Sequence, residues 1–137
     1  MPEAPPTEGR MRCHCGGVEI AVRFPSRFAA HCYCASCRIT HGTGVVTWIG
    51  FKRSQVEVTK GAELLRDYAS SPGTNRRYCG HCGTRMMFES QRPDWADEVH
   101  LPLGLFVTPV DRAPAVNSFA GERPEWAPLD PHLKSYG

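Results

Sequence analysis

The 137-residue chain is predicted to fold as one small, mainly β domain. It contains 12 prolines and 13 glycines, which favour frequent turns over long helices. Short runs of β-branched and aromatic residues lie between the turns, and one run alternates between apolar and polar positions. We expect residues 1–10 to form a disordered tail, because they are polar and proline-rich, residues 11–130 to form the domain, and residues 131–137 to form a second tail.

The strands are assigned in chain order. Val18, Ile20 and Val22 alternate with less apolar residues, which indicates a strand with one buried face that ends before Pro25. Residues 30–44 are expected to form a loop, with room for one short helical turn after Cys37. The chain after residue 109 carries no regular signal, although its aromatic residues can dock onto the domain. Further strands are expected at residues 45–49, 56–58, 64–69, 86–88 and 99–107, with a turn at 70–73.

Charge and hydropathy argue against nucleic-acid and membrane partners. The formal net charge is +2 and the pI about 8.2, so no basic footprint is evident. No apolar run approaches the roughly 18 residues of a membrane span. The first ten residues do not resemble a signal peptide, because they contain acids and prolines and no apolar stretch. We therefore expect a cytoplasmic location, where thiols stay reduced.

Four of the seven cysteines are expected to form a closed metal site. An odd number cannot pair completely into disulfides, and cysteines this close in sequence more readily direct their sulfurs at one ion. Two glycine-flanked knuckles, CHCGG at 13–17 and CGHCG at 79–83, supply four thiolates, enough for the tetrahedral shell of structural zinc. Buried, unligated cysteines are the alternative. The expected ligands are Cys13, Cys15, Cys79 and Cys82.

The remaining cysteines, Cys32, Cys34 and Cys37, lie within six residues and can coordinate a second ion from a single segment. No eighth cysteine is present to complete the shell, so the fourth position is expected to stay open, as reactive zinc sites require. Two alternatives remain at this point. His31 or His41 can close the shell as a structural site, or all seven cysteines can share one cluster.

Other polar and aromatic residues give weaker signals. His14 and His81 are expected to face solvent, and His100 and His132 to be surface or packing residues. The tryptophans at 48, 95 and 126 are expected to pack in the core or at its edge. Four arginines near the knuckles either bind a carboxylate-bearing ligand or form a solvated face that balances anionic zinc–thiolate centres. They are Arg38, Arg76, Arg77 and Arg85.

The ordered set of cysteine groups resembles the glutathione-dependent formaldehyde-activating family, also called the centromere-protein-V-like (CENP-V) domain. The resemblance covers roughly residues 11–130, whereas the proline-rich C-terminal region departs from the family. It implies an Mss4-like small β domain built around the cysteine knuckles, with structural zinc on the outer pairs and catalytic zinc on the middle trio. The matching segments are residues 13–17, 31–38, 44–48, 70–73, 78–83 and 123–126.

The resemblance also implies that a carbon–sulfur bond is formed or cleaved, as in S-(hydroxymethyl)glutathione. The expected function is a zinc-dependent carbon–sulfur lyase acting on a thiol adduct, with two zinc ions per chain. The expected partner is a small thiol, glutathione among the candidates, which would bind beside Cys32, Cys34 and Cys37. His31 and His41 are the histidines nearest in sequence for proton transfer. A non-catalytic zinc scaffold and a labile-zinc thiol sensor are the alternative functions.

Overall fold

Residues 4–137 are described by the computed structural model, and strands dominate them, which confirms the predicted mainly β fold. The first six strands are β1 (Glu8–Arg12), β2 (Glu19–Arg23), β3 (Phe28–Cys32), β4 (Val46–Lys52), β5 (Val56–Lys60) and β6 (Leu65–Ser71). The others are β7 (Thr74–Cys79), β8 (Arg85–Ser90), β9 (Glu98–Pro102), β10 (Val116–Ser118) and β11 (Lys134–Ser135). One helix of seven residues, α1 (Ala35–His41), follows β3.

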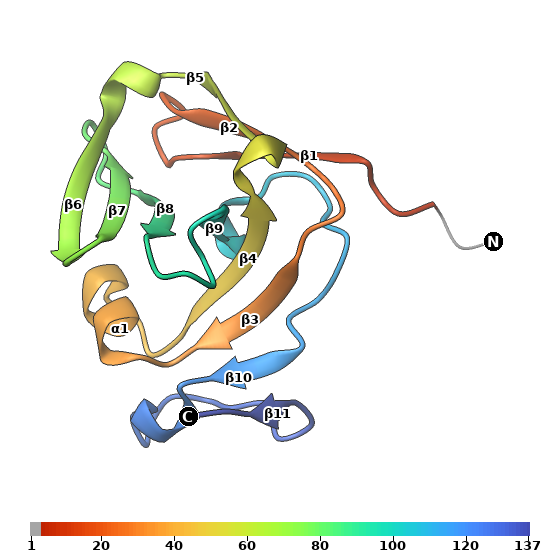
Figure 1. Ribbon diagram of the computed structural model, residues 1–137, viewed down its shortest axis with the longest axis vertical. Helices are drawn as coiled ribbons and strands as arrows, with labels where there is room; N and C mark the ends of the chain where they lie inside the picture. The colour runs from red at the N-terminus through yellow and green to blue at the C-terminus, as the bar shows by residue number, and fades with distance from the viewer. Residues whose placement is uncertain (1–3) are drawn as a thin grey trace.

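The strands form two sheets (Figure 1). The smaller sheet has the order β1-β2-β5, and the larger has the order β11-β10-β3-β4-β9-β8-β7-β6. Figure 1 shows the larger sheet curving from β6 round to β11, with the smaller sheet across its top. The larger core cluster contains apolar residues of both sheets, among them Met11, Ile20, Ile49 and Leu101, each fully buried. Strand β2 contributes to this core through alternation, because Ile20 and Val22 are buried on one face while Glu19 and Arg23 are exposed on the other.

The segment β3–α1–β4 brings three cysteines to one end of the larger sheet. Cys32 is the last residue of β3 and pairs with Val46 at the start of β4. Cys34 caps α1, since its sulfur accepts a hydrogen bond from the Cys37 backbone N–H at 3.3 Å. Gly42 ends the helix with φ +65°, and its N–H donates to the Arg38 carbonyl. The helix therefore begins at Ala35, two residues before Cys37. The sequence predicted a loop here, with one short helical turn only after Cys37.

Two further segments contribute to the site. A turn was predicted at 70–73, and the structure has it at 72–73, because β6 continues to Ser71, which lies opposite Thr74 in the hairpin with β7. Strand β7 lies between β6 and β8, carries Arg76 and ends at Cys79. A smaller core cluster forms around Cys32, Cys37 and Trp48, away from the main core. Trp48 is buried as predicted, whereas Trp126 is 74% exposed and covers Gly44.

The chain ends differ from the sequence expectation. Strand β1 begins at Glu8, inside the expected tail, and the Phe24 N–H donates to the Thr7 carbonyl at 3.0 Å. Residues 1–3 of that tail lie outside the described residues. After residue 109, β10 pairs in parallel with β3, and β11 pairs in parallel with β10. These strands have two or three residues each, so no periodicity in the sequence could mark them.

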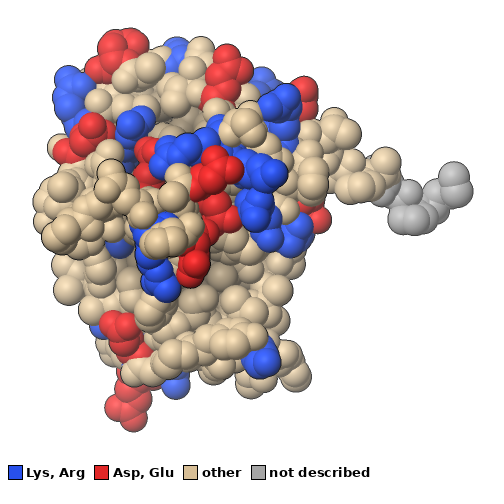
Figure 2. Space-filling model, viewed as in Figure 1, with Lys and Arg blue, Asp and Glu red and all other residues tan. Residues whose placement is uncertain are grey.

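The surface carries charges of both signs. Figure 2 shows acidic and basic side chains intermingled over the upper part of one face, with a lower part that is mostly uncharged. Ion pairs join some of them, including Arg27 with Glu98 at 2.7 Å and Arg77 with Asp67 at 3.2 Å. Within residues 4–137, the helices are all too short or too polar to cross a bilayer.

Gly61 connects β5 to the segment that leads into β6, and we expect Gly61→Ala to destabilise the fold strongly. Its φ is +75°, and an added Cβ would lie 1.9 Å from the Gly17 carbonyl oxygen, in the first cysteine knuckle. The strain and the displaced backbone together should lower the free energy of unfolding by about 2–5 kcal/mol. Gly42→Ala is the matched control, because its φ of +65° meets no neighbouring atom within 4 Å. Equal losses in urea denaturation would contradict the steric argument.

Candidate functional site

The four outer cysteines converge, although Cys15 and Cys79 are 64 positions apart in the sequence. All four sulfurs lie within 4.8 Å of one another. Cys13 Sγ and Cys15 Sγ are 3.5 Å apart, and Cys15 Sγ and Cys79 Sγ are 3.9 Å apart. A tetrahedron of sulfurs at zinc-bond length has edges of about 3.8 Å. The arrangement could therefore hold one metal ion between the start of the chain and the end of β7.

Backbone N–H groups surround these sulfurs. The Val18 N–H donates to Cys13 Sγ at 3.2 Å, and the Gly17 N–H donates to Cys15 Sγ at 3.4 Å. Gly16, with φ +75°, makes the tight turn that directs these donors. Cys13 and Cys79 are fully buried. Such hydrogen bonds stabilise thiolates, as in closed structural metal sites, and burial shields two of the four sulfurs, while Cys82 is partly buried and Cys15 is exposed.

The middle three cysteines form a separate group. Their sulfurs also lie within 4.8 Å of one another, with Cys32 Sγ and Cys37 Sγ 3.6 Å apart. Cys32 and Cys37 are buried, and Cys34 is half-buried. In the described part of the chain, this group includes no histidine, so neither His31 nor His41 closes it here, and the two groups do not merge into one cluster.

Arg76 reaches the middle group from β7. Its side chain is only 5% exposed, and its two terminal nitrogens lie 3.8 and 3.7 Å from Cys37 Sγ. Its other hydrogen bonds go to the hydroxyls of Ser36, Thr40 and Ser70. Among residues 4–137, no carboxylate pairs with this guanidinium. A buried positive charge requires an anion nearby, and the cysteine sulfurs are the groups in place to supply it.

The thiol pKa values reflect this clustering. Hydrogen bonds from Cys32 and Cys34, and then the charge of Arg76, lower the pKa of Cys37 far below that of an ordinary thiol. Hydrogen bonds with Cys34 and Cys37, and then burial, raise the pKa of Cys32. A single negative charge is therefore favoured on the group, and three thiolates require a bound cation.

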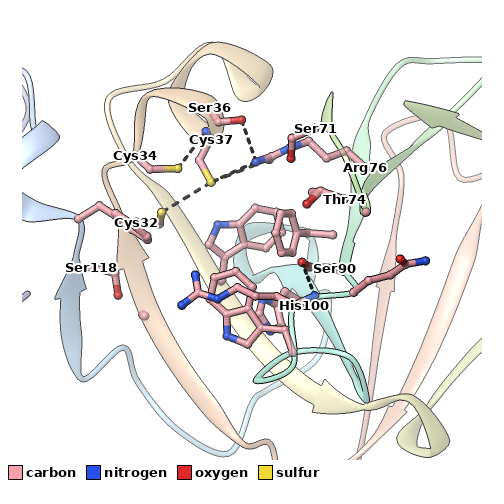
Figure 3. A pocket seen from close by; sticks show the side chains of 18 of the residues that line it. Cys32, Cys34, Ser36, Cys37, Ser71, Thr74, Arg76, Ser90, His100 and Ser118 are labelled. Carbon is pink, nitrogen blue, oxygen red and sulfur yellow. Dashed lines mark hydrogen bonds between the residues drawn. The ribbon is translucent and has the colours of Figure 1, made fainter. Parts of the chain in front are cut away.

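A cavity of about 710 Å³ opens beside the middle cysteines. Figure 3 shows Cys32, Cys37 and Arg76 along one side of it, with His100 and Ser90 across from them. Aromatic side chains line the wall between these two sides, and most of the wall is apolar. The cavity therefore joins a group of convergent thiols to a concave, mostly apolar space, which is the usual form of a small-molecule site.

The histidines nearest in sequence to the trio do not line this cavity. His31 lies on the opposite face of β3 from Cys32, because side chains alternate along a strand, and its Nδ1 is 2.8 Å from Thr47 Oγ1. His41 packs edge-on against Trp48, and burial, with the charges of Arg76 and Arg85, lowers its pKa to about 4.

His100 does line the cavity and is only 6% exposed. Its Nε2 lies 3.1 Å from Glu98 Oε1, and burial lowers its pKa. The sequence indicated a surface or packing histidine, and the structure adds its place in the cavity wall. His14, His81 and His132 are exposed, as expected for the first two.

The arginines near the knuckles mostly have partners within the protein. Arg38 donates to the Tyr33 carbonyl, Arg85 donates to the Thr40 carbonyl, and Arg77 pairs with Asp67 and Glu89. The sequence offered no reason to choose Arg92, which lines the cavity with its guanidinium 4.5 Å from the Trp95 ring centre.

Sequence reasoning also missed the aromatic wall. Phe88 and His100 face each other because β8 and β9 pair in this register. Trp95 reaches both residues from the loop that joins these strands. A run of apolar residues marks each strand, but no signal within either run fixes which residues meet across the pair.

Comparisons with known proteins find a family model, a relative and a solved structure that are similar to this chain. The family model described as "Glutathione-dependent formaldehyde-activating enzyme" matches residues 8–122. A protein of Halomonas elongata, named as a candidate glutathione-dependent formaldehyde-activating enzyme, is 28% identical over 127 residues, covering 86% of this chain and 78% of its own length. A crystal structure of a Rhodobacter sphaeroides protein is similar, with a TM-score of 0.58 and 28% identity, over 70% of this chain and 85% of that one.

Proposed function

Because the chain belongs to the glutathione-dependent formaldehyde-activating enzyme family, we propose that it makes and breaks the carbon–sulfur bond between a thiol and a small aldehyde. The observation that carries the proposal is the middle group of cysteines. Three sulfurs converge beside a cavity, while the other four cysteines form a group of their own. A complete set and an incomplete set of ligands in one chain match a structural site and a reactive site.

We infer that zinc occupies both groups. All-sulfur donor sets suit zinc, and the sulfur–sulfur distances of 3.5, 3.9 and 3.6 Å agree with its bond lengths. The outer cysteines would enclose one ion, and Cys32, Cys34 and Cys37 would hold the other with one coordination position left for a ligand from the cavity. Zinc held by the trio would lower the pKa of a thiol in that position, so that the thiolate would exist at neutral pH.

The cleavage of a hydroxymethyl thioether can be written with atoms balanced. The hydroxyl proton leaves, the C–O bond becomes a carbonyl, and the C–S bond breaks as sulfur departs with the electron pair as a thiolate. No oxidant or reductant takes part. His100 lines the cavity and is held by Glu98, and its lowered pKa keeps it neutral and able to accept the hydroxyl proton. In the direction of synthesis, His100 returns this proton to the new hydroxyl.

Arg76 supports the reactive group without touching the substrate's reacting atoms. Its guanidinium, next to Cys37, balances the negative charge of three thiolates in a buried place. The apolar part of the cavity wall offers water few hydrogen-bond partners, which disfavours water as a competitor of the thiol for the aldehyde. A non-catalytic zinc scaffold would need neither the cavity nor its position beside the cysteines, so the cavity favours an enzyme.

Exchange between free and thiol-bound formaldehyde tests the proposal. With ¹³C-formaldehyde and glutathione at equilibrium, zinc-loaded protein is expected to increase the exchange rate measured by two-dimensional exchange NMR. Protein that has lost one zinc to a brief chelator treatment, and kept its fold by circular dichroism, is expected to lose that increase. Exchange no faster with the loaded protein than in buffer, with glutathione and also with butanethiol and 2-phenylethanethiol, would contradict the proposed function.

Arg76→Gln is expected to weaken metal binding at the middle group by about 10–100-fold, as loss of a supporting contact typically does. The reason is that three thiolates would lose the buried cation beside Cys37. Competition with a chromogenic chelator measures the affinity of each ion in turn. The matched control is Arg77→Gln, because that side chain is paired at the surface on the same strand. Equal affinities in the two variants, with unchanged melting temperatures, would contradict the role assigned to Arg76.

A further inference from the structure

Five rings form a continuous cluster in the wall of the cavity beside the middle cysteines (Figure 3). Phe88 is at its centre, with its ring 5.7 Å from Trp48, 5.8 Å from Trp95 and 5.4 Å from His100. Phe28 lies edge-on to His100 at 4.8 Å. The spacings are those of interacting aromatic pairs, so the rings hold one another in place.

These rings belong to the site and not only to the protein core. The main core cluster does not include them, and each of the five lines the cavity. Phe28, Phe88 and Trp95 are only partly buried, so their remaining surface is available to a ligand. Four of the rings are on strands, namely β3, β4, β8 and β9, and the fifth is in the loop before β9. Side chains on strands are held more precisely than side chains on loops, so most of the wall is rigid.

The charged groups of the cavity are few and already engaged. All three guanidinium nitrogens of Arg76 contact the hydroxyls of Ser36, Thr40 and Ser70 or the sulfur of Cys37. Arg92 lies over Trp95 and near Asp94, at the outer edge. Among residues 4–137, the lining contains no aspartate or glutamate.

Glutathione fits this lining poorly. At neutral pH it carries two carboxylates and one ammonium group, and such groups bind most strongly to unengaged side chains of opposite charge. Besides neutral serine, threonine and glutamine side chains, the cavity offers Arg92 to the carboxylates and no acid to the ammonium. An aromatic ring fits this lining better than glutathione does, because the rings of the wall can stack against it and bury its apolar area.

We propose that the thiol handled at this site carries an aromatic group within a few atoms of its sulfur. The inference rests on the proposed function. The thiol's sulfur would lie beside Cys32, Cys34 and Cys37, and its ring would lie against Phe88 and Trp95. The adduct of this thiol with a small aldehyde is cleaved as above: the C–S bond breaks, the hydroxyl proton leaves, and the thiolate that carries the aromatic group is released together with the aldehyde.

Three thiols of different character test this assignment with the zinc-loaded protein. Exchange of ¹³C-formaldehyde is measured with 2-phenylethanethiol, butanethiol and glutathione, and kcat/KM is compared. We expect 2-phenylethanethiol to exceed both others by about tenfold or more, as stacking on two rings predicts. Glutathione equal to or better than 2-phenylethanethiol overturns the aromatic assignment and leaves the proposed function intact. No acceleration with any of the three overturns the proposed function, and the assignment with it.

A pair of tryptophan variants locates the preference. Trp95→Leu is expected to reduce kcat/KM for 2-phenylethanethiol about tenfold and to reduce that for butanethiol less, mainly through KM. Trp126→Leu is the matched control, because Trp126 is 74% exposed and outside the cavity lining, and it should alter neither. Melting temperatures report whether Trp95→Leu remains folded. Equal losses for the two thiols in folded Trp95→Leu would overturn the placement of the ring.

Discussion

Replacement of Cys79 by serine is expected to unfold the protein under conditions in which the wild type is stable. Cys79 is fully buried at the end of β7, and its sulfur lies 3.9 Å from Cys15 Sγ, near the start of the chain. Loss of one ligand opens the outer group and leaves three sulfurs without a complete shell, among them that of the fully buried Cys13. Structural zinc contributes about 10–16 kcal/mol in small domains, against a total stability of about 5–15 kcal/mol.

The expected result for Cys79→Ser is loss of both metal ions and of the cooperative thermal transition, or a fall in melting temperature of about 20 °C or more. Metal analysis and circular dichroism measure the two quantities. A soluble variant that keeps two ions per chain and melts near the wild-type temperature would show that the outer group does not hold the fold together.

Replacement of Cys34 by serine is expected to have the opposite consequence: the fold remains and the activity is lost. Cys34 caps helix α1 through its sulfur, and serine is among the best residues at this position, so its hydroxyl can accept the Cys37 N–H instead. Cys34 is half-buried, so the change leaves no large cavity in the core. A neutral hydroxyl, however, is a poor ligand for zinc in place of a thiolate.

For Cys34→Ser we expect the acceleration of thiol–formaldehyde exchange to fall by more than about 100-fold, since loss of supporting residues alone costs 10–100-fold. The metal content should fall from two ions to one, with the melting temperature within a few degrees of wild type. Exchange kinetics, metal analysis and thermal unfolding, carried out on the same preparation, measure all three. Wild-type exchange rates in a variant that holds one ion would place the chemistry elsewhere.

The parts of the fold that the sequence predicted are those with a local signal. Strand β2 shows its alternation in five residues, and β4 is rich in β-branched and aromatic residues. Strands β3 and β7 lack these signals: Phe28–Cys32 contains two alanines, and Thr74–Cys79 is mostly polar. Both lie inside the larger sheet between two neighbours, so tertiary pairing overrides their local preferences.

The candidate site divides in the same way. Cysteine spacing predicted one group of four sulfurs and one of three, but it left a single shared cluster open, because spacing constrains each ligand pair and not which pairs meet in the fold. The cavity could not be predicted, since its wall combines Phe28, Trp48, Phe88, Trp95 and His100 from distant segments. Its chemistry depends on the register of β8 with β9 and on the direction of Arg76, and neither is fixed within a short window of sequence.

X-ray absorption at the zinc edge, combined with anomalous scattering at each site, tests the division of the cysteines most directly. We expect one ion with four sulfur neighbours at about 2.3 Å and a second with three sulfurs and one lighter atom, the latter exchanged for a fourth sulfur when thiol is added. A single ion per chain, or a second ion whose neighbours do not change on addition of thiol, would contradict a reactive centre at Cys32, Cys34 and Cys37.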